Sequence, residues 1–243
     1  NAIVNVEGST IDREVDYSLH TRAGPEIGVA STKSFTSQLV ILFLMAIALG
    51  KKFNNLKLPK IESYVSYLNK LPRAISKMLE LESQIITVAQ AIKNSNSVIF
   101  LGRGYLYPLA LEGALKLKEL SYIHAEGFAA GEMKHGPIAL IEDELPVIMF
   151  LIADGLEDKS ISNLQEAHSR GAKIILFADK TCIDKTPFAH LKIEIPNFLD
   201  EFKAVLSPVL MSIPAQLLAY HVAKERGTDV DQPRNLAKSV TVE

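Results

Sequence analysis

Short apolar runs alternate along this chain with longer stretches in which apolar residues recur at helical spacing. The clearest runs cover residues 97–101, 146–152 and 173–178, and each is apolar almost throughout. A strand has this composition when helices cover both faces of its sheet. The runs therefore predict parallel strands of an α/β protein, connected by helices.

The stretches around these runs supply the rest of one α/β unit. They predict helices over residues 108–121, 158–170 and 201–226 and a weaker strand over residues 190–195. Gly171 is placed to be the left-handed residue that ends the second helix. We therefore expect one complete, doubly wound parallel sheet in a domain of residues 83–228.

The first fifty residues repeat part of this order. A short apolar strand over residues 2–6, a second strand over 17–21 and a long helix over 31–49, closed by Gly50, follow one another as the elements of residues 173–227 do. Ile11-Asp12 corresponds in this repeat to Ile183-Asp184, and Gln38-Leu39 to Gln216-Leu217. We interpret residues 1–55 as the C-terminal half of a preceding copy, and so expect the chain to be a fragment.

Two further segments complete the predicted organisation. Residues 56–82 contain no strand pattern and form a helical connector, in which Pro59 and Pro72 each suit a first helical turn. Residues 229–243 form a polar tail.

Composition narrows the functional classes. The formal net charge is only -2, so the basic field that a nucleic-acid or membrane-surface protein needs is absent. The single cysteine, Cys182, excludes an intrachain disulfide, and no signal sequence opens the chain. The most apolar run, residues 39–49, is about half the length of a membrane span and predicts a buried helix. We expect a cytoplasmic protein.

Three charged residues share one face of the helix predicted over residues 108–121. Glu112, Lys116 and Glu119 stand at positions i, i+4 and i+7. Spacing alone favours a solvated ion pair with one extra carboxylate. The alternative is a carboxylate and an ammonium group in a polar pocket. Isomerising a sugar needs this pair: a base that moves a proton between adjacent carbons, and a cation that stabilises the enediolate oxygen.

The next stretch, HAEGFAAGEMKHGP over residues 124–137, is rich in polar groups and glycine. It is typical of a helix end and turn with solvated charges, but His135 also has the chemistry of an acid/base near neutral pH. A metal site is disfavoured, because His124 and Glu126 are too close in sequence for one helical face. Dinucleotide binding at Gly102-Arg103-Gly104 is disfavoured too, because Tyr107 replaces the third glycine of that fingerprint.

The segment after Gly227, TDVDQPRNLAKSVTVE, would by default be a frayed tail. Its spaced apolar residues are Val230, Leu236, Val240 and Val242. A fully solvated tail would not need them. If the tail packs, Lys238 becomes a candidate amine nucleophile toward a carbonyl.

Three long strings carry a family resemblance. EIGVASTKSFTSQL (26–39), LEGALKLKELSYIHAEGFAAGEMKHGP (111–137) and DQPRNLAKSVTVE (231–243) resemble the glucosamine-6-phosphate synthase family, in the family's order. The resemblance implies the C-terminal isomerase part, built from flavodoxin-like sugar-isomerase (SIS) domains, with one complete copy and the end of a preceding one. It also implies conversion of fructose 6-phosphate and ammonia to glucosamine 6-phosphate, without a metal or organic cofactor.

The resemblance implies a role for each matching residue. Glu119 resembles the base for proton transfer between C1 and C2, and Lys116 its assisting cation. His135 resembles the histidine that opens the sugar ring from across a homodimer interface. Lys238 resembles the lysine that forms a Schiff base with the open-chain sugar. The residues that match sugar-lining positions are Val29, Ser31 and Ala237.

Two departures limit what the chain can do by itself. The family's glutaminase domain, which supplies the ammonia, depends on an N-terminal cysteine, whereas this chain begins with Asn1. The family's phosphate-gripping loop would precede Asn1, and the equivalent loop after Ile152, ADGLEDKS, is too acidic to replace it. The competing hypothesis is a non-catalytic module that senses a phosphosugar. Such regulators usually carry a helix-turn-helix domain and a basic surface, and neither is visible here.

Overall fold

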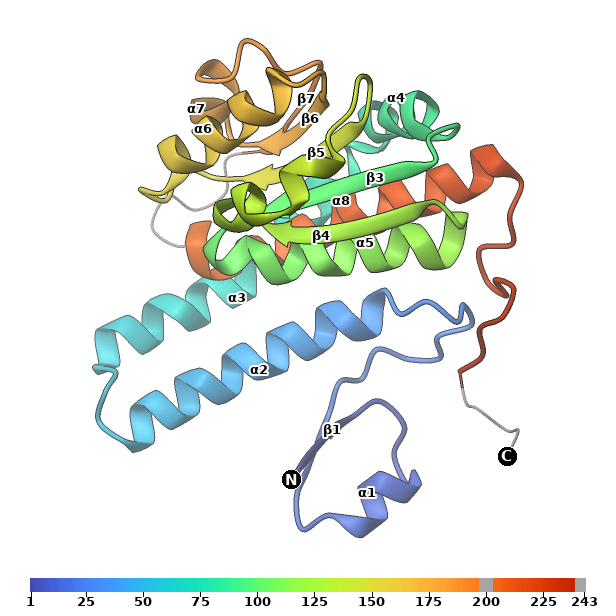
Figure 1. Cartoon of the computed structure of the whole chain (residues 1–243). Coiled ribbons are helices and arrows are strands. Elements are labelled where there is room, and N and C mark those ends of the chain that lie inside the picture. The colour runs from blue at the N-terminus through green and yellow to red at the C-terminus, as the bar shows by residue number, and fades with distance from the viewer. Residues whose placement is uncertain (197–202, 239–243) are drawn as a thin grey trace. The chain divides into compact units, whose positions relative to one another are not determined.

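The computed structural model describes residues 1–196 and 203–238, with the backbone alone at residues 203 and 204 (Figure 1). The chain forms two compact units. Unit 1 contains residues 1–72 and the tail from Asn235, and unit 2 contains residues 73–234. The division into residues 1–55, 56–82, 83–228 and 229–243 stays a prediction.

Unit 2 is built on a five-stranded sheet whose neighbouring strands all pair in parallel (Figure 1). The strand order is β4-β3-β5-β6-β7. The strands are β3 (Ser97–Gly102), β4 (His124–Ala129), β5 (Pro146–Leu151), β6 (Lys173–Ala178) and β7 (Leu191–Glu194). The chain moves outward from β3 to β4 and then returns to β5 on the other side of β3, which makes the sheet doubly wound.

Helices cover both faces of this sheet. The helices of unit 2 are α4 (Glu82–Ile92), α5 (Tyr107–Ser121), α6 (Glu157–His168), α7 (Lys180–Asp184) and α8 (Lys203–Arg226). On one face Phe100, Phe150 and Phe177 form a row of rings, and Gly113 of α5 lies against the first two. On the other face the alternate strand residues pack with Ile161 of α6. The predicted α/β doubly wound fold is confirmed.

Unit 1 begins with the order of elements that ends unit 2, namely strand, short helix, strand and long helix. Strands β1 (Ala2–Val4) and β2 (Ser18–His20) pair in parallel on either side of the short helix α1 (Thr10–Glu14). Helix α2 (Lys33–Lys52) follows, and it leads into α3 (Leu58–Leu79), which continues into unit 2. Within unit 1, Phe43 of α2 meets Tyr64 of α3 edge to face, with ring centroids 5.3 Å apart.

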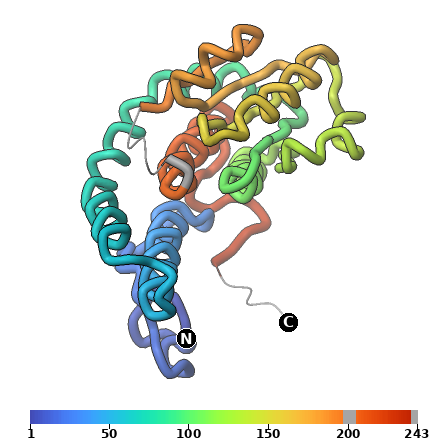
Figure 2. Tube along the Cα trace, turned by 90° about the vertical axis from the view of Figure 1, so that its left-hand side faces the viewer, coloured from blue at the N-terminus to red at the C-terminus, as the bar shows by residue number. Residues whose placement is uncertain are grey.

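The sequence predicted a buried helix over the apolar run 39–49, and this prediction is wrong. Of the residues of α2, only Ser34 and Ile47 are buried. By length and composition, both α2 and the stretch 205–226 of α8 would pass as membrane spans. Most of the α8 stretch is buried. Figure 2 shows the trace of α8, in orange to red, from a second side. In unit 1 only a two-stranded sheet is described, which is too small to cover α2.

Other corrections concern local signals. Gly50 does not close α2 but lies inside it, where a Cβ atom would stand 2.6 Å from the Leu56 side chain, so glycine here permits close packing. Pro72 lies inside α3 rather than in a first turn, whereas Pro59 does stand in the first turn. The stretch 124–137, expected to be a turn, contains strand β4 and the 3-10 helices η2 (Ala130–His135) and η3 (Pro137–Leu140).

Candidate functional site

Helix α5 holds the three charged residues together, as their spacing predicted. The ammonium group of Lys116 donates to a carboxylate oxygen of Glu119 at 2.7 Å and lies 3.6 Å from a carboxylate oxygen of Glu112. The side chain of Lys116 is only 4% exposed. A lysine that is buried between two carboxylates is not part of a solvated surface pair, so the structure excludes the simpler of the two interpretations.

The two carboxylates of this cluster differ in environment. Burial raises the pKa of Glu112, and Lys116 opposes that effect only in part. Glu119 is the more exposed of the two, with 22% of its side chain accessible against 13% for Glu112. Glu119 therefore combines direct contact with the ammonium group and access for a ligand, which a proton-transferring base needs.

The cluster does not lie at the carboxyl edge of the sheet, where doubly wound folds usually bind ligands. Glu119 is twelve residues after the start of α5, which corresponds to about 18 Å along the helix axis. At the carboxyl edge itself, Gly102 has no room for a Cβ atom, because the backbone oxygen of Leu106 would stand 2.1 Å away. The backbone of residues 102–106 thus packs against itself and fills the space after β3.

The loop after β5 is negatively charged at the start of α6. The backbone N–H of Gly155 donates to Glu157 at 2.7 Å, and that of Leu156 donates to Asp154 at 2.9 Å. These carboxylates occupy the helix N-terminus, where a phosphate would otherwise find N–H donors. The geometry agrees with the expectation that this loop is not a phosphate site.

His135 stands at the end of η2, the 3-10 helix that follows the edge strand β4, and its side chain is exposed. Two contacts hold this segment to α6. Lys134 pairs with Glu166 at 2.8 Å, and Arg103, whose guanidinium group packs beside Gly131, donates to Asn163 at 2.8 Å. His135 is therefore exposed on a segment that contacts α6 through the Lys134–Glu166 ion pair.

Unit 1 contains the amine and the other predicted residues. Lys238 lies in the tail, exposed, and its ammonium group donates to the backbone oxygen of Glu26. Val29 and Ser31 belong to the loop that follows Glu26, and both are half-buried, whereas Ala237 is exposed. The structure therefore brings Lys238 to the loop of Val29 and Ser31 within unit 1, and it brings Lys116 and Glu119 together within unit 2.

Glu26 is a residue that the sequence reasoning missed. Its carboxylate accepts from the Ser34 hydroxyl at 2.6 Å and from the backbone N–H of Thr32 at 2.9 Å, at the N-terminus of α2. Burial raises the pKa of Glu26, but the hydrogen bonds from Ser34 and Thr32 outweigh it and hold that pKa below its ordinary value. The Glu26 carboxylate thus shapes the loop whose backbone receives Lys238.

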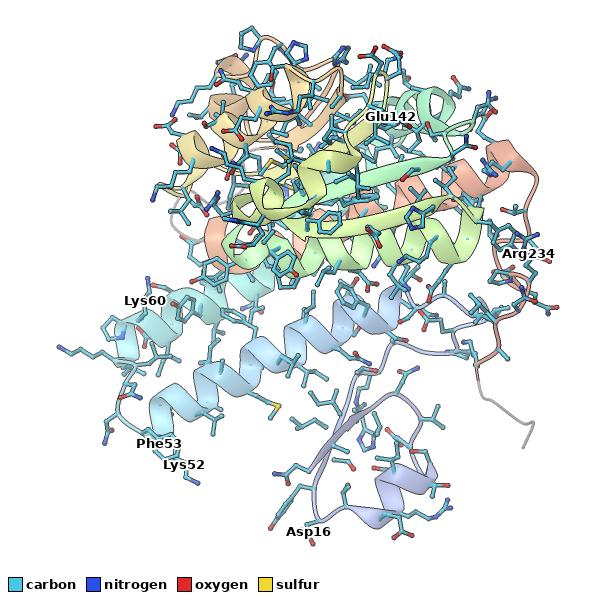
Figure 3. The ribbon with its side chains drawn as sticks, viewed as in Figure 1. Asp16, Lys52, Phe53, Lys60, Glu142 and Arg234 are labelled. Atoms are coloured by element: carbon cyan, nitrogen blue, oxygen red, sulfur yellow. The ribbon has the colours of Figure 1, made fainter. Side chains whose placement is uncertain are left out.

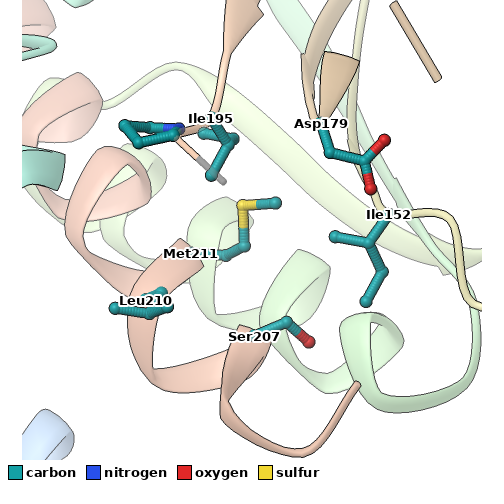
Figure 4. A pocket seen from close by; sticks show the side chains of 7 residues that line it. Ile152, Asp179, Ile195, Ser207, Leu210 and Met211 are labelled. Atoms are coloured by element: carbon teal, nitrogen blue, oxygen red, sulfur yellow. The ribbon is translucent and has the colours of Figure 1, made fainter. Parts of the chain in front are cut away.

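Two cavities that the structure describes in unit 2 are lined by other residues than the charged cluster on α5. The first, between Asp179 and Met211 (Figure 4), has a volume of about 30 Å³, which is far smaller than a typical ligand pocket. A polar groove of about 330 Å³ lies at the amino ends of β3, β5 and β6. Cys182 is buried and its thiol pKa is raised by burial, so it is no nucleophile. Within residues 1–196 and 203–238, no three His, Cys, Asp or Glu side chains are grouped to hold a metal.

A parallel sheet with helices on both faces defines a doubly wound α/β protein. This protein carries an ionisable cluster on α5. The model of the SIS domain family matches residues 2–48 and 91–226. The chain belongs to the SIS domain family. The first matched segment covers the strand-helix run of unit 1, which supports the half-repeat predicted from the sequence.

Curated proteins are similar in sequence to this chain over its whole length. Glutamine–fructose-6-phosphate aminotransferase (isomerizing) from Bradyrhizobium diazoefficiens is 52% identical over 242 residues, and the enzyme of the same name from Brucella abortus is 50% identical. Both alignments cover 100% of this chain and 39% of the relative. The chain thus spans about two fifths of the length of these relatives.

Solved structures resemble this chain as well. The C-terminal domain of glucosamine-fructose-6-phosphate aminotransferase from Francisella tularensis has a TM-score of 0.89 and 45% identity, over 95% of this chain and 64% of that one. Glucosamine-6-phosphate deaminase from Thermotoga maritima has a TM-score of 0.70 and 23% identity, over 98% of this chain and 65% of that one. The second likeness concerns the fold alone.

Proposed function

We propose that this chain is the isomerising part of a glutamine–fructose-6-phosphate aminotransferase, which converts fructose 6-phosphate and ammonia to glucosamine 6-phosphate. The observation that carries the proposal is the buried Lys116 held between Glu112 and Glu119, in a chain half identical to enzymes of that name. A buried ion cluster adds little net stability, because the cost of desolvating its charges offsets their attraction, and this favours a role in catalysis.

The proposed chemistry uses few groups. The amine of Lys238 attacks the C2 carbonyl of open-chain fructose 6-phosphate and releases water, which leaves a Schiff base. Ammonia then displaces the lysine and leaves an imine at C2. Glu119 removes a proton from C1 and returns one to C2, while the proton of O1 passes to the imine nitrogen, so that C1 becomes an aldehyde and C2 carries an amine. Lys116 stabilises the negative charge that develops on oxygen during this transfer.

Several parts of this proposal lie outside the chain. Ammonia would come from a glutaminase domain of the full protein, and the sugar phosphate would be held outside unit 2, because Asp154 and Glu157 occupy the helix N-terminus there. We further propose a cytoplasmic homodimer in which the exposed His135 serves ring opening in the neighbouring subunit's site. Val29, Ser31 and Ala237 would line the sugar.

The test is interconversion of fructose 6-phosphate and glucose 6-phosphate. The chain is assayed as it stands and fused behind the residues that precede the matching region in the Bradyrhizobium relative. We expect Glu119→Gln and Lys238→Ala to lower the rate by orders of magnitude. Lys118→Ala, an exposed neighbour on α5, is the matched control and should keep the rate. Unchanged rates in both site variants would contradict the catalytic roles.

The competing function is a phosphosugar sensor without turnover. It predicts that the fusion binds fructose 6-phosphate, seen by calorimetry, yet neither isomerises it nor forms a Schiff base. A covalent adduct with Lys238, trapped by borohydride and located by mass spectrometry, would exclude this alternative.

A further inference from the structure

The end of helix α5 is fastened to the segment that follows α8. The backbone N–H of Arg234 donates to the phenol oxygen of Tyr122 at 2.7 Å, and the guanidinium carbon of Arg234 lies 4.1 Å from the centre of the Tyr122 ring. Figure 3 labels Arg234 on this segment. We call this pair of contacts the Tyr122–Arg234 latch. Both residues belong to unit 2.

Both sides of the latch are held by their own surroundings. Tyr122 ends α5 in a left-handed conformation, with φ of 62°, and its N–H still donates to the Lys118 carbonyl. On the other side, Asp229 accepts from the N–H groups of Gln232 and Asp231, each at 2.9 Å. These two N–H groups, that of Gln232 first, hold the pKa of Asp229 below its ordinary value. The latch thus joins two preformed turns.

The latch shortens the chain between the helix of the proposed base and the proposed amine. Before it, Thr228 is tied to the end of α5, through a hydrogen bond of 2.6 Å to the Leu120 carbonyl. From Thr228 to Lys238 the chain has ten residues, but from Arg234 only four, which reach at most about 14 Å. Loop-closure entropy depends on the logarithm of length, so the shorter tether raises the local concentration of the amine about fourfold.

We propose that Tyr122 and Arg234 are positioning residues for Lys238. The latch holds Arg234 at the end of α5, and because only four residues separate Arg234 from Lys238, it limits the positions from which the amine can reach the sugar. This inference rests on the proposed function, in which Lys238 forms the Schiff base. Neither residue touches the reacting atoms. Their effect passes through the backbone of the four residues between Arg234 and Lys238.

The two contacts of the latch can be removed separately. Tyr122→Phe removes the acceptor for the Arg234 N–H and keeps the ring, whereas Arg234→Ala keeps the N–H and removes the guanidinium group. Tyr122→Leu removes both. Tyr105→Phe is the matched control, because it deletes the hydroxyl of another tyrosine in unit 2, one that is 61% exposed.

The full chain, as it stands and in the fusion described above, is incubated with fructose 6-phosphate and borohydride. Lys238 forms an imine with release of water, and borohydride donates hydride to the imine carbon and fixes the adduct as a secondary amine. The adduct rate is measured at varied sugar concentration. Hydrogen exchange of residues 228–238 and the urea midpoint of unfolding are measured on the same variants.

We expect Tyr122→Leu to lower the adduct rate at saturating sugar by about fourfold to tenfold, the range from the tether effect to the loss of one hydrogen bond. Tyr122→Phe and Arg234→Ala should each have a smaller effect. The half-saturating sugar concentration should not change, the urea midpoint should fall by no more than the loss of one hydrogen bond causes, and the amide of Arg234 should exchange faster in Tyr122→Phe. A purely structural role would lower the midpoint and leave the saturated adduct rate unchanged.

Two different failures can be told apart. If the unsubstituted protein forms no adduct, or forms it equally well in Lys238→Ala, the proposed function and the latch both fall. If the unsubstituted protein forms the adduct and Tyr122→Leu forms it at the same saturated rate, the latch alone is overturned. A lower rate in Tyr105→Phe equal to that in Tyr122→Phe would overturn it as well.

Discussion

The run β1-α1-β2-α2 at the start of the chain and the run β6-α7-β7-α8 near its end have the same order of elements but opposite environments. In both, two parallel strands flank a five-residue helix and a long helix follows. Both short helices begin with a side-chain cap, Ser9 in the first run and Asp179 in the second. The two runs therefore form the same elements, although their burial differs.

Burial is what differs between the two runs. Strand β6 pairs with β5 on one side and β7 on the other, and α8 packs into the core of unit 2. In the part of the chain that the structure describes, β1 pairs only with β2, and α2 exposes Leu42, Leu44 and Leu49. Figure 3 labels Lys52 and Phe53, where α2 ends. The same pattern thus gives a core helix only where neighbouring strands and helices cover it.

The largest difference is expected where a charge is placed at matched positions of the two long helices. Val222 of α8 is fully buried, and Leu44, its counterpart in the repeat, is 44% exposed. Val222→Lys should lower the free energy of unfolding by more than about 4 kcal/mol, because the ammonium group would be buried without a partner. Leu44→Lys should change it by less than about 0.5 kcal/mol.

Urea unfolding of the chain, followed by circular dichroism, measures both variants. Leu44→Met is the control, since it keeps the apolar character of α2. Similar losses in Val222→Lys and Leu44→Lys would mean that α2 is covered as well as α8 is, and the contrast between the two runs would fail.

A middle-sized difference is expected at the caps. Asp179 is 4% exposed and accepts from the N–H groups of Ala153 at 2.8 Å and Cys182 at 3.0 Å. Asp179→Ala leaves both donors without their acceptor and should cost about 2–3 kcal/mol. Ser9 accepts from Asp12 at 3.4 Å, so Ser9→Ala should cost at most about 1 kcal/mol.

The comparison of the caps uses the same unfolding experiment. Asp179→Asn serves as the second variant, since an amide oxygen can still accept one hydrogen bond, and it should lie between the unsubstituted chain and Asp179→Ala. A loss in Ser9→Ala that matches the loss in Asp179→Ala would show that the first run is as tightly packed as the second.

Most elements could be predicted from the sequence because their environment leaves a mark on composition. The central strands β3, β5 and β6 are covered on both faces and are apolar almost throughout, so their runs were visible. Strand β4 was missed because it lies at the sheet edge and pairs only with β3, which allows polar residues such as His124 and Glu126. Its one signal is Gly127, where a Cβ atom would stand 2.8 Å from the α5 backbone.

The candidate site was predictable only where its residues are close in sequence. Helical spacing put Glu112, Lys116 and Glu119 on one face, but it could not say that the face is buried. Glu26 accepts hydrogen bonds from Thr32 and Ser34, which follow it by six and eight residues at the start of α2. A capping box joins residues that are three apart, so no pattern in the sequence signalled this arrangement. Tyr122 and Arg234 are 112 residues apart, so their contact depends on the fold.

The smallest difference between the two runs is expected in their response to pH. In the first run the pKa of Glu26 is lowered, so its stabilising contribution is complete above about pH 4.5 and is lost as the pH falls through the folded value. In the second run Asp184 raises the pKa of Lys180, so the stabilising contribution of that pair is complete below about pH 10.5 and is lost as the pH rises through the folded value.

Amide NMR shifts against pH should therefore show an acid transition at Thr32 and Ser34 that Glu26→Gln abolishes. An alkaline transition near Lys180 should vanish in Asp184→Asn and persist in Glu26→Gln. An acid transition at Thr32 that survives Glu26→Gln would show that another group organises the start of α2.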